Sequence, residues 1–244
     1  MTPVALVTGA SRGIGAACAA GLARASFDVG ITYAADRDGA ERTAEAVSAA
    51  GARAHVCRAE AREPGSAAAA VRQVEEALGS LDALVLNAGT TRDGPAVRMT
   101  GEAWSEPIEV NLGGAFEAAQ AAARGMAERG SGSIVAVGSV VGSYGNAGQA
   151  NYAASKAAVI GMVRTLAREL GPSGVRVNAV VPGYIRTRLT DAIPEEGRRR
   201  MLDATALGRF GEPGDVAGPV VFLCSGASGF VTGAALAVDG GMRI

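Results

Sequence analysis

The sequence predicts an α/β fold in which a doubly wound parallel sheet of about seven strands carries helices on both faces. Short, β-branched apolar runs alternate with longer alanine-rich segments over all 244 residues. The apolar runs are continuous, which is typical of strands that are buried on both faces of a parallel sheet. A glycine-rich turn joins the first apolar run to the first alanine-rich segment. These observations favour one layer of strands between two layers of helices.

Runs of β-branched and other apolar residues predict the strands, because such residues pack well on a pleated sheet. In chain order these strands are Val4–Thr8, Val29–Thr32, Ala54–Cys57, Ala83–Leu86, Ile134–Val137, Val175–Val181 and Ala235–Val238. The alanine-rich segments between them predict helices, since alanine is the best helix former. These helices are Gly13–Ala25, Gly39–Ala50, Ser66–Leu78, Val110–Glu128, Tyr152–Leu170 and Asp215–Ser225.

The chain is expected to form a single domain. No Pro/Ser-rich linker or change in composition divides residues 1–244, and this length is normal for one α/β domain. The predicted helix of residues 152–170 is apolar nearly all round, which fits a helix buried between the sheet and a partner subunit. Pro107 predicts a break or a new helix start before Val110, because proline cannot donate a helical hydrogen bond.

The composition argues against several classes of protein. Basic and acidic residues nearly balance, 23 against 24, so no global field recruits nucleic acid or anionic lipid. No stretch approaches the roughly 20 apolar residues that a membrane span needs. The N-terminus lacks the basic start of a secretory signal. We therefore expect a cytoplasmic protein that binds neither nucleic acid nor a membrane.

Cysteine and histidine are too few and too scattered to suggest a metal site. Cys18, Cys57 and Cys224 lie far apart in apolar surroundings and form no CxxC pair. His55, the only histidine, falls in a short strand-like run without partners. We expect reduced, buried thiols, a structural or surface histidine, and no metal.

A glycine-rich turn follows the first predicted strand and opens the first predicted helix. Its glycines have the spacing G-x-x-x-G-x-G, and it includes Gly9, Ser11, Arg12, Gly13, Ile14 and Gly15. Glycines permit a tight turn and let the backbone approach a pyrophosphate, while the helix N-terminus supplies free N–H groups and a positive dipole end. This context predicts a dinucleotide site in a Rossmann-like domain.

The end of the second predicted strand favours NADP(H) over NAD(H). The strand runs into Ala34 with no carboxylate at its tip, where an acidic residue typically holds the ribose 2′-hydroxyl of NAD. Arg12 in the glycine turn and Arg37 just beyond the strand are candidates for binding a 2′-phosphate. Asp36 opposes this interpretation, because its charge would repel a phosphate if it pointed inward.

Small and polar residues follow the fourth and fifth predicted strands. Asn87, Ala88 and Gly89 follow the fourth strand, and Ser139 follows the fifth. Doubly wound folds bind ligands at the carboxyl ends of their strands, so these residues are expected beside a bound cofactor. Taken alone, Asn87–Gly89 would also suit a plain strand end.

Lys156 is the only lysine in a chain that has 22 arginines. It lies four residues after Tyr152, so both side chains can share one face of the predicted helix. A site that must fit a cation between a phenol and a sugar needs the compact ammonium of lysine rather than the wide fork of arginine. By itself, the Tyr-x-x-x-Lys spacing would equally describe an exposed surface lysine.

Together these motifs resemble the short-chain dehydrogenase/reductase superfamily over essentially the whole chain. The motifs that carry the resemblance are Thr8–Gly15, Asn87–Gly89, Asn111, Ser139, Tyr152–Lys156 and Pro182–Gly183. Further segments resemble the 3-oxoacyl-[acyl-carrier-protein] reductases, namely Thr91–Gly94, Gly138–Gly142, Gly148–Tyr152, Asn178–Gly183 and Val238–Met242. Relatives of this kind are commonly tetramers, so the resemblance implies a homotetramer.

The resemblance implies a catalytic set of four residues. Tyr152 would donate a proton to the substrate carbonyl oxygen as hydride arrives from the nicotinamide, and Ser139 would hydrogen-bond that oxygen. Lys156 would hold the nicotinamide ribose and lower the pKa of Tyr152 toward the operating pH. Asn111 would hold a water that links Lys156 to solvent.

The resemblance also implies further cofactor contacts and a lid. Glu60 and Ala61 would lie beside the adenine, with Glu60 where the family usually has an aspartate. The segment over the nicotinamide comprises Pro182, Gly183, Ile185 and Thr187. Residues 184–207 would cover the substrate. The arginines of this lid would receive an acidic acyl carrier protein, or they would simply belong to a solvated helix paired with Glu195 and Glu196.

We consider three functions from this sequence. The first is NADPH-dependent reduction of a 3-oxoacyl thioester, carried by an acyl carrier protein, in fatty-acid or polyketide synthesis. The second keeps the chemistry but acts on a free ketone or secondary alcohol. The third is a non-catalytic nucleotide sensor on the same fold, which the fold alone would permit. The joint presence of Asn111, Ser139, Tyr152 and Lys156 favours an enzyme, because a sensor needs no proton chain.

Overall fold

The computed structural model describes residues 2–187 and 195–242 of the chain. Its centre is a parallel seven-stranded sheet in the order β3-β2-β1-β4-β5-β6-β7. The strands are β1 (Val4–Val7), β2 (Asp28–Tyr33), β3 (Ala54–Arg58), β4 (Leu81–Leu86), β5 (Gly132–Val137), β6 (Val175–Pro182) and β7 (Ala235–Val238). Each predicted strand is present with small changes at its ends, and the predicted fold class is confirmed.

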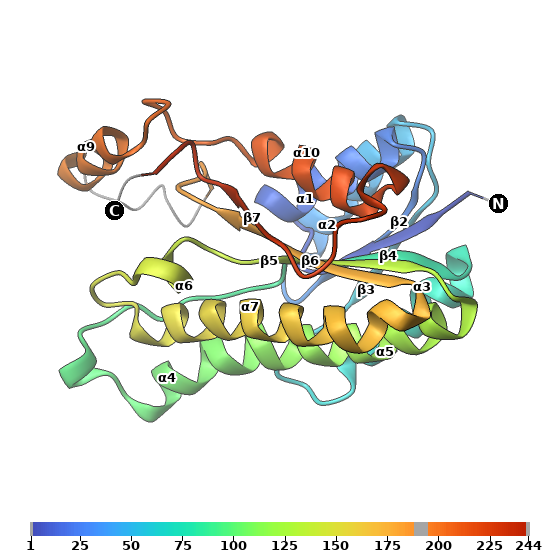
Figure 1. Cartoon of the computed structure of the whole chain (residues 1–244), viewed down its shortest axis with the longest axis horizontal. Helices are drawn as coiled ribbons and strands as arrows, with labels where there is room; N and C mark the ends of the chain where they lie inside the picture. The colour runs from blue at the N-terminus through green and yellow to red at the C-terminus, as the bar shows by residue number, and fades with distance from the viewer. Residues whose placement is uncertain (1, 188–194, 243–244) are drawn as a thin grey trace.

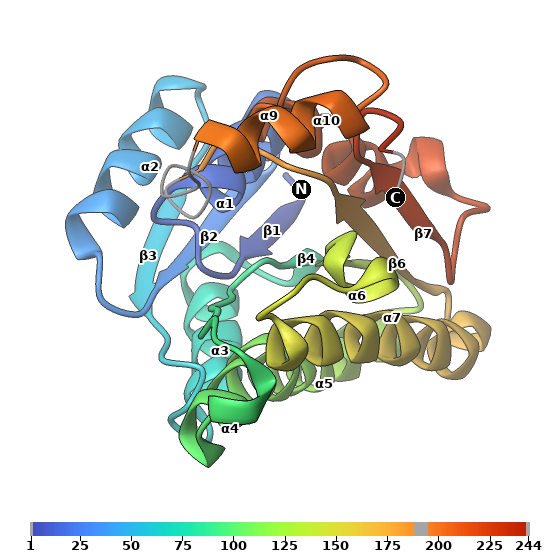
Figure 2. The ribbon, with the colours of Figure 1, turned by 90° about the vertical axis from the view of Figure 1, so that its left-hand side faces the viewer.

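Helices form a layer on each face of the sheet (Figures 1 and 2). One layer contains α1 (Gly13–Arg24), α2 (Arg37–Ala49) and α10 (Pro213–Cys224). The other contains α3 (Ser66–Leu78), α5 (Ala115–Arg129) and α7 (Ala150–Leu170). The shorter helices are α4 (Gly101–Ile108), α6 (Val141–Tyr144) and α9 (Glu195–Ala204), with single 3-10 turns at Ala96–Arg98, Gly171–Ser173 and Gly226–Ser228. None of the helices in the described ranges is long and apolar enough to cross a membrane.

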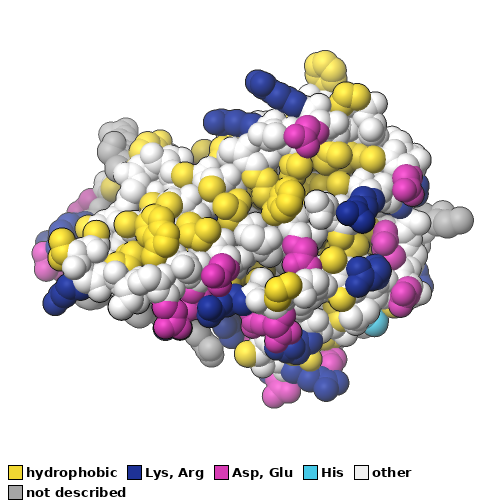
Figure 3. Space-filling view, turned by 90° about the horizontal axis from the view of Figure 1, so that it is seen from below, with side chains coloured by type: hydrophobic (Ala, Val, Ile, Leu, Met, Phe, Trp, Pro, Cys, Tyr) yellow, Lys and Arg dark blue, Asp and Glu magenta, His cyan; other side chains and the backbone are white. Residues whose placement is uncertain are grey.

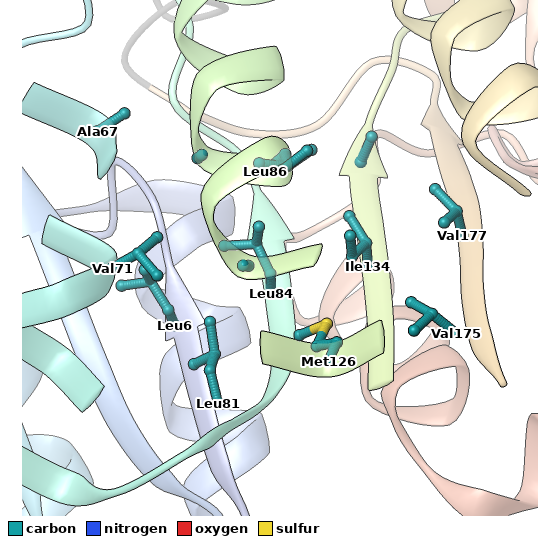
Figure 4. Packing of buried hydrophobic residues seen from close by; sticks show 14 of the residues in the cluster. Leu6, Ala67, Val71, Leu81, Leu84, Leu86, Met126, Ile134, Val175 and Val177 are labelled. Atoms are coloured by element: carbon teal, nitrogen blue, oxygen red, sulfur yellow. The ribbon is translucent and has the colours of Figure 1, made fainter. Parts of the chain in front are cut away.

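The strands divide their side chains between two separate hydrophobic cores. In β1, Val4 and Leu6 pack into the core beneath α3, α5 and α7, whereas Ala5 and Val7 pack into the core beneath α1, α2 and α10. This follows from the two-residue period of a strand, which sends successive side chains to opposite faces. Figure 4 shows Leu6 with Val71, Leu84, Met126, Ile134 and Val177 in the first of these cores. Burial on both faces explains why the strand sequences are continuously apolar.

The predicted break at Pro107 is wrong, because the backbone stays helical through this residue. Pro107 lies inside α4, and the chain continues through a π-helical turn, Glu109–Gly114, into α5. Proline removes the N–H that would normally bond the carbonyl four residues earlier. That carbonyl, of Ala103, instead accepts a hydrogen bond of 2.6 Å from the side chain of Asn151. A tertiary contact therefore replaces the missing helical bond.

The order of the strands places a crevice at the carboxyl ends of the strands. β1 lies inside the sheet, bonded to β2 on one side and to β4 on the other. The chain thus runs outward in opposite directions from β1 and β4, and the loops that follow these strands separate. Ligands of doubly wound folds bind at this switch point, outside the carboxyl ends of the strands.

Candidate active site

A cleft of about 1670 Å³ opens at the carboxyl ends of the strands. Nearly all the residues that the sequence assigned to a cofactor or to catalysis line it. They are Gly9, Ser11, Arg12, Gly13, Ile14, Gly15, Glu60, Ala61, Asn87, Ala88, Gly89, Ser139, Tyr152, Lys156, Pro182, Gly183, Ile185 and Thr187. Arg37 and Asn111 are not among the residues that line the cleft in the described chain. In the same described residues, no cluster of His, Cys, Asp or Glu could hold a metal ion.

The glycine turn has the shape that a pyrophosphate requires. Gly9 and Gly13 have φ values of 62° and 58°, which only glycine adopts readily. A Cβ at Gly15 would lie 2.5 Å from Asn87 Nδ2 and 2.6 Å from the Gly9 carbonyl oxygen, so the turn has no room for a side chain there. Within the described chain, the N-terminus of α1 has no side-chain cap and no acidic residue in its first turn. Its free N–H groups therefore fit an anion.

Asn87 fixes the glycine turn to the end of β4. Its Nδ2 donates to the carbonyls of Thr8 and Gly9, at 2.9 Å each. In return, the backbone N–H groups of Asn87 and Ala88 donate to Thr8 Oγ1 at 2.9 and 3.1 Å. The two neighbouring strand ends are thereby locked together. Asn87 thus shapes the floor of the cleft, a role that its position at a strand end did not reveal.

The far end of the cleft is polar and carries two arginines and one carboxylate. Arg12 Nη1 lies 2.8 Å from Asp36 Oδ2, and Asp36 also accepts from the N–H of Gly39 and so caps α2. That backbone hydrogen bond, together with the charges of Arg12 and Arg42, holds the pKa of Asp36 below its usual value. Arg42 lines the cleft, whereas Arg37 is directed to Glu41 at 3.4 Å.

Arg42 is therefore a cleft residue that sequence reasoning missed. Arg37 was proposed because it follows the second strand, and the helix was predicted to begin at Gly39, but the Asp36 cap starts it at Arg37. Arg42 lies inside this helix, beyond the segment next to the strand. Aspartate is a favoured N-cap residue, so Asp36 was a signal for the true start.

The candidate catalytic residues meet where β5 leads toward α7. The Ser139 side chain lies close enough to the Tyr152 phenol to lower its pKa. Lys156 Nζ lies 5.8 Å from the centre of the Tyr152 ring and donates to the Val137 carbonyl at 2.8 Å. Both Tyr152 and Lys156 come from the first two turns of α7, so the four-residue spacing does bring them to the same side of the helix.

The local environment shifts the pKa of both Tyr152 and Lys156. Burial raises the pKa of Tyr152, the nearby Ser139 side chain opposes this, and the charge of Asp93 raises it further. Burial lowers the pKa of Lys156 to about 8, because it penalises the charged ammonium. The lowering of the Tyr152 pKa expected from Lys156 is therefore not what this arrangement gives, since the net shift of the phenol is upward.

Asn111 lies behind the cleft and is almost fully buried, in the π-helical turn. Its Nδ2 donates to the Thr90 carbonyl at 3.0 Å and to Ser155 Oγ at 2.9 Å. Its Oδ1 accepts from the Thr90 N–H at 2.8 Å. The side chain thus connects the loop after β4 to α7, one residue before Lys156. Its two amide hydrogens are already engaged.

The loop after β4 supplies cleft residues that the sequence reasoning did not assign individually. Asp93 accepts from Gln149 Nε2 at 2.9 Å, and both side chains line the cleft beside Tyr152. Arg92 Nε lies 2.8 Å from Glu106 Oε2, which is largely buried. The segments that contain Arg92, Asp93 and Gln149 resemble the reductase family, but residue spacing alone does not indicate that they meet.

Part of the predicted lid lies outside the described residues, namely 188–194. Of the remainder, Tyr184 packs edge-on against Phe210, with 6.3 Å between the ring centres, and Arg198 lies 5.7 Å from the centre of the Phe210 ring. Arg186 pairs with Glu212 at 3.2 Å, and Arg200 pairs with Glu196 at 2.9 Å. Of these contacts, the one between Arg198 and Phe210 joins α9 to the segment that follows it.

Comparison with known proteins relates this site to a large enzyme family. A family model described as Enoyl-(Acyl carrier protein) reductase matches residues 9–243. The chain is 43% identical over 242 residues to 3-oxoacyl-[acyl-carrier-protein] reductase FabG of Staphylococcus aureus, covering 99% of this chain and 98% of the relative. It is 44% identical over 239 residues to FabG of Vibrio cholerae, covering 98% of this chain and 96% of the relative.

Solved structures give the same result. A blue fluorescent protein from a metagenomic library, solved with NADPH, has a TM-score of 0.92 and 39% identity, covering 98% of this chain and 97% of its own. Acetoin dehydrogenase YohF of Salmonella typhimurium has a TM-score of 0.91 and 35% identity, covering 99% of this chain and 96% of its own. The similarity thus extends over essentially the whole chain in both sequence and structure.

Proposed function

This chain belongs to the short-chain dehydrogenase/reductase family of NAD(P)-dependent oxidoreductases, and we propose that it uses NADPH to reduce a 3-oxoacyl thioester to the 3-hydroxyacyl thioester. The acyl group is carried by an acyl carrier protein, in fatty-acid or polyketide synthesis. The observation that carries the proposal is the convergence of Ser139, Tyr152 and Lys156 in the same cleft as the glycine turn. A nucleotide sensor would have no use for this hydroxyl, phenol and ammonium.

The residues of the cleft fit a dinucleotide along its whole length. The glycine turn and the N-terminus of α1 receive the pyrophosphate. Arg12 and Arg42 receive the 2′-phosphate of NADPH, and their two charges outweigh the single carboxylate of Asp36. Glu60 and Ala61 would hold the adenine, Asn87 to Gly89 would contact the cofactor, and Pro182, Gly183, Ile185 and Thr187 would hold the nicotinamide; all of them line the cleft.

The side chains of the site donate the proton and stabilise the negative charge that develops on the carbonyl oxygen. When bound, the reduced nicotinamide supplies the hydride that adds to the carbonyl carbon. Ser139 donates a hydrogen bond to the carbonyl oxygen and so polarises it. Tyr152 gives its phenolic proton to the same oxygen, which completes the alcohol. Its raised pKa keeps that proton in place until the oxygen becomes basic enough to take it.

Lys156 and Asn111 support this proton transfer. The ammonium of Lys156 holds the hydroxyls of the nicotinamide ribose and stabilises the phenolate that remains after transfer. Asn111 holds the water through which Lys156 exchanges protons with solvent. Because its amide hydrogens are bonded to Thr90 and Ser155, this water must donate to an oxygen of Asn111 rather than accept from its amide.

The activities for which the relatives are named support the choice of a carrier-bound substrate. The reductases of Staphylococcus aureus and Vibrio cholerae are named for 3-oxoacyl groups on an acyl carrier protein. A free ketone or secondary alcohol is the second candidate, because acetoin dehydrogenase YohF has a similar structure at 35% identity.

Turnover with graded substrates distinguishes these candidates. NADPH oxidation is followed with acetoacetyl-acyl carrier protein, with longer carrier-bound 3-oxoacyl groups, and with a free diketone such as diacetyl. We expect kcat/KM to be highest for a carrier-bound substrate. A higher kcat/KM for diacetyl would favour the second candidate, a reductase of free ketones. No turnover with any carbonyl compound would favour a nucleotide sensor.

We also propose that the protein assembles as a homotetramer in the cytoplasm. Large apolar side chains are exposed on the face formed by α4, α5 and α7, where Figure 3 shows hydrophobic atoms gathered together. Trp104 of α4 and Phe116 of α5 have 46% and 45% of their surface exposed. A second copy of the chain would cover them.

A further inference from the structure

Asn151 is a fully buried polar residue that the proposed reaction does not use, although it directly precedes Tyr152. Its Nδ2 donates to the carbonyls of Arg92 and Ala103 at 2.8 and 2.6 Å. Its Oδ1 accepts from the N–H of Tyr152 at 2.7 Å. One amide therefore connects three separate parts of the fold: the loop after β4, helix α4 and the start of α7.

The bond to Tyr152 caps the helix that carries the catalytic phenol. The first N–H groups of a helix have no partner within it and are usually capped by the side chain of the preceding residue. Gln149 occupies that position in α7, and in the described chain its side chain makes no capping bond and is directed to Asp93 instead. Asn151 Oδ1 supplies the missing acceptor at Tyr152 itself.

The bond to Ala103 depends on a proline in a neighbouring helix. Position 107 lies four residues after Ala103, so its N–H would normally bond the Ala103 carbonyl within α4. Pro107 has no N–H, and the carbonyl is left for Asn151. Pro107 and Asn151 are therefore complementary: the first frees an acceptor, and the second supplies the donor for it.

The bond to Arg92 ties the same amide to the wall of the cleft opposite α7. The loop is also held by a bond of 2.8 Å from the Gly94 N–H to the Gly148 carbonyl. Asp93 of this loop lies close enough to Tyr152 to raise its pKa. A displacement of Tyr152 against this loop would therefore alter both the position of the phenol and its tendency to release a proton.

We propose that Asn151 is a positioning residue, which fixes the Tyr152 phenol against Ser139 and the loop after β4 by means of the acceptor that Pro107 leaves free in α4. The inference rests on the proposed function, because it assigns Asn151 to the proton donor of that reaction. It concerns the geometry of the donor and not the binding of cofactor or substrate.

The test compares Asn151→Ala with Asn178→Ala. Asn178 is also a fully buried asparagine with paired donor and acceptor bonds, to Val231 and Ala234, but it lies in the middle of β6. Both variants lose a buried hydrogen-bonding side chain, so we expect both to lower Tm by about 2–10 °C. Asn178→Ala therefore measures what a merely structural loss does to catalysis.

We expect Asn151→Ala to lower kcat for the best carbonyl substrate by about 10- to 100-fold, because small displacements of a reacting group are costly. The KM for NADPH should stay within about twofold of its original value. The pKa of the Tyr152 phenol, measured by ultraviolet titration, should also shift, because Tyr152 moves relative to Asp93. Asn178→Ala should change kcat by less than about threefold and leave the phenol pKa in place. Equal kcat values for the two variants would overturn the proposal.

The Pro107→Ala substitution separates the effect of Asn151 on the stability of the fold from its effect on the position of Tyr152. In the double variant with Asn151→Ala, the new N–H of residue 107 can bond the orphaned Ala103 carbonyl, so we expect part of the lost Tm to return. The N–H of Tyr152 stays uncapped, so kcat should stay low. Recovery of both Tm and kcat would show that Asn151 is only structural. No recovery of Tm would contradict the complementarity of Pro107 and Asn151.

Failure of this inference can be told apart from failure of the proposed function. If the unmodified protein reduces no carbonyl compound, the proposed reaction fails first. The role of Asn151 is then tested by measuring the pKa of the Tyr152 phenol. This pKa is obtained from the ultraviolet absorbance difference between the protein and its Tyr152→Phe variant as pH is raised. An unchanged phenol pKa in Asn151→Ala would contradict the proposal without any measurement of turnover.

Discussion

Tyr152 and Lys156 form a buried acid and cation that depend on each other. Burial disfavours the charged form of each, so the phenol keeps its proton and the ammonium releases its own more easily than usual. Neither charge is stable there alone, whereas a phenolate beside an ammonium is. The site is thus arranged so that negative charge appears on Tyr152 only when its proton has been given to a substrate.

The pH dependence of reduction follows from these two shifts. Lys156 has a pKa of about 8, below the ordinary 10.5, whereas the pKa of Tyr152 is raised, so Lys156 is the first of the two to lose its proton as pH rises. We expect kcat/KM to be level near pH 6–7 and to fall above about pH 8. Arginine stays protonated, so the weak residual activity of Lys156→Arg should lack this limb. A rate that rises through pH 9 would contradict this assignment.

Arg42, rather than Arg37, should determine the preference for NADPH. Arg42 lines the cleft beside Asp36, whereas Arg37 is directed to Glu41. We expect Arg42→Ala to raise the KM for NADPH by about tenfold and to leave the KM for NADH nearly unchanged, as the loss of one phosphate contact implies. Arg37→Ala, which removes an equal charge from the same helix, is the control. If both variants raised the KM for NADPH equally, the preference for NADPH would come from the overall positive charge of the helix and not from a contact made by Arg42.

Most of the candidate site could be predicted from residues at strand ends, but some features depend on tertiary contacts. Tyr152 and Lys156 follow from helical spacing, and the glycines follow from their place after β1. Arg42 was missed because it lies inside α2, away from the end of β2, and reaches the cleft only in the folded chain. The upward pKa shift of Tyr152 was missed because burial and the nearby charge of Asp93 arise only in the folded chain.

At the scale of elements, the packing of α3 on the sheet depends on a glycine in β2. A Cβ at Gly30 would lie 2.5 and 2.7 Å from the two methyl carbons of Val74 in α3. We expect Gly30→Ala to destabilise the fold by about 1–3 kcal/mol through overpacking. Val74→Ala removes those methyl groups, so the double variant should be more stable than the sum of the single effects by about 1 kcal/mol.

Denaturant unfolding of the four proteins measures this coupling. Additive losses would mean that β2 and α3 do not approach as closely as described. The pair is a suitable probe because Gly30 and Val74 are not among the residues that line the cleft.

The regular elements follow local patterns, while the irregular ones do not. Strand positions were predictable because β-branched apolar runs mark a sheet covered on both faces. Helix α4 and the π-helical turn were not predicted, since Pro107 indicates a break in local terms. The bond from Asn151, 44 residues after Pro107, allows the helix to pass through the proline. A local sequence pattern cannot indicate a hydrogen-bond partner that lies so far along the chain.

At the scale of the whole molecule, the exposed apolar face predicts an assembly. We expect light scattering to give a mass of about four times 24.3 kDa for the unmodified protein. Phe116→Glu places a charge on this face and should reduce the mass, because an unpaired charge is costly in a buried interface. Ser48→Glu adds the same charge to the exposed part of α2 and should leave the mass unchanged. A monomeric unmodified protein would contradict the expected assembly.

The most direct test of the proposed chemistry is the effect of Tyr152→Phe on turnover of acetoacetyl-acyl carrier protein with NADPH. The change removes one oxygen atom and leaves the ring, the cleft and the glycine turn in place. We predict that NADPH binding, measured by fluorescence titration, stays within about twofold, while kcat falls by at least about 100-fold. Turnover within a few-fold of the unmodified protein would mean that Tyr152 is not the proton donor.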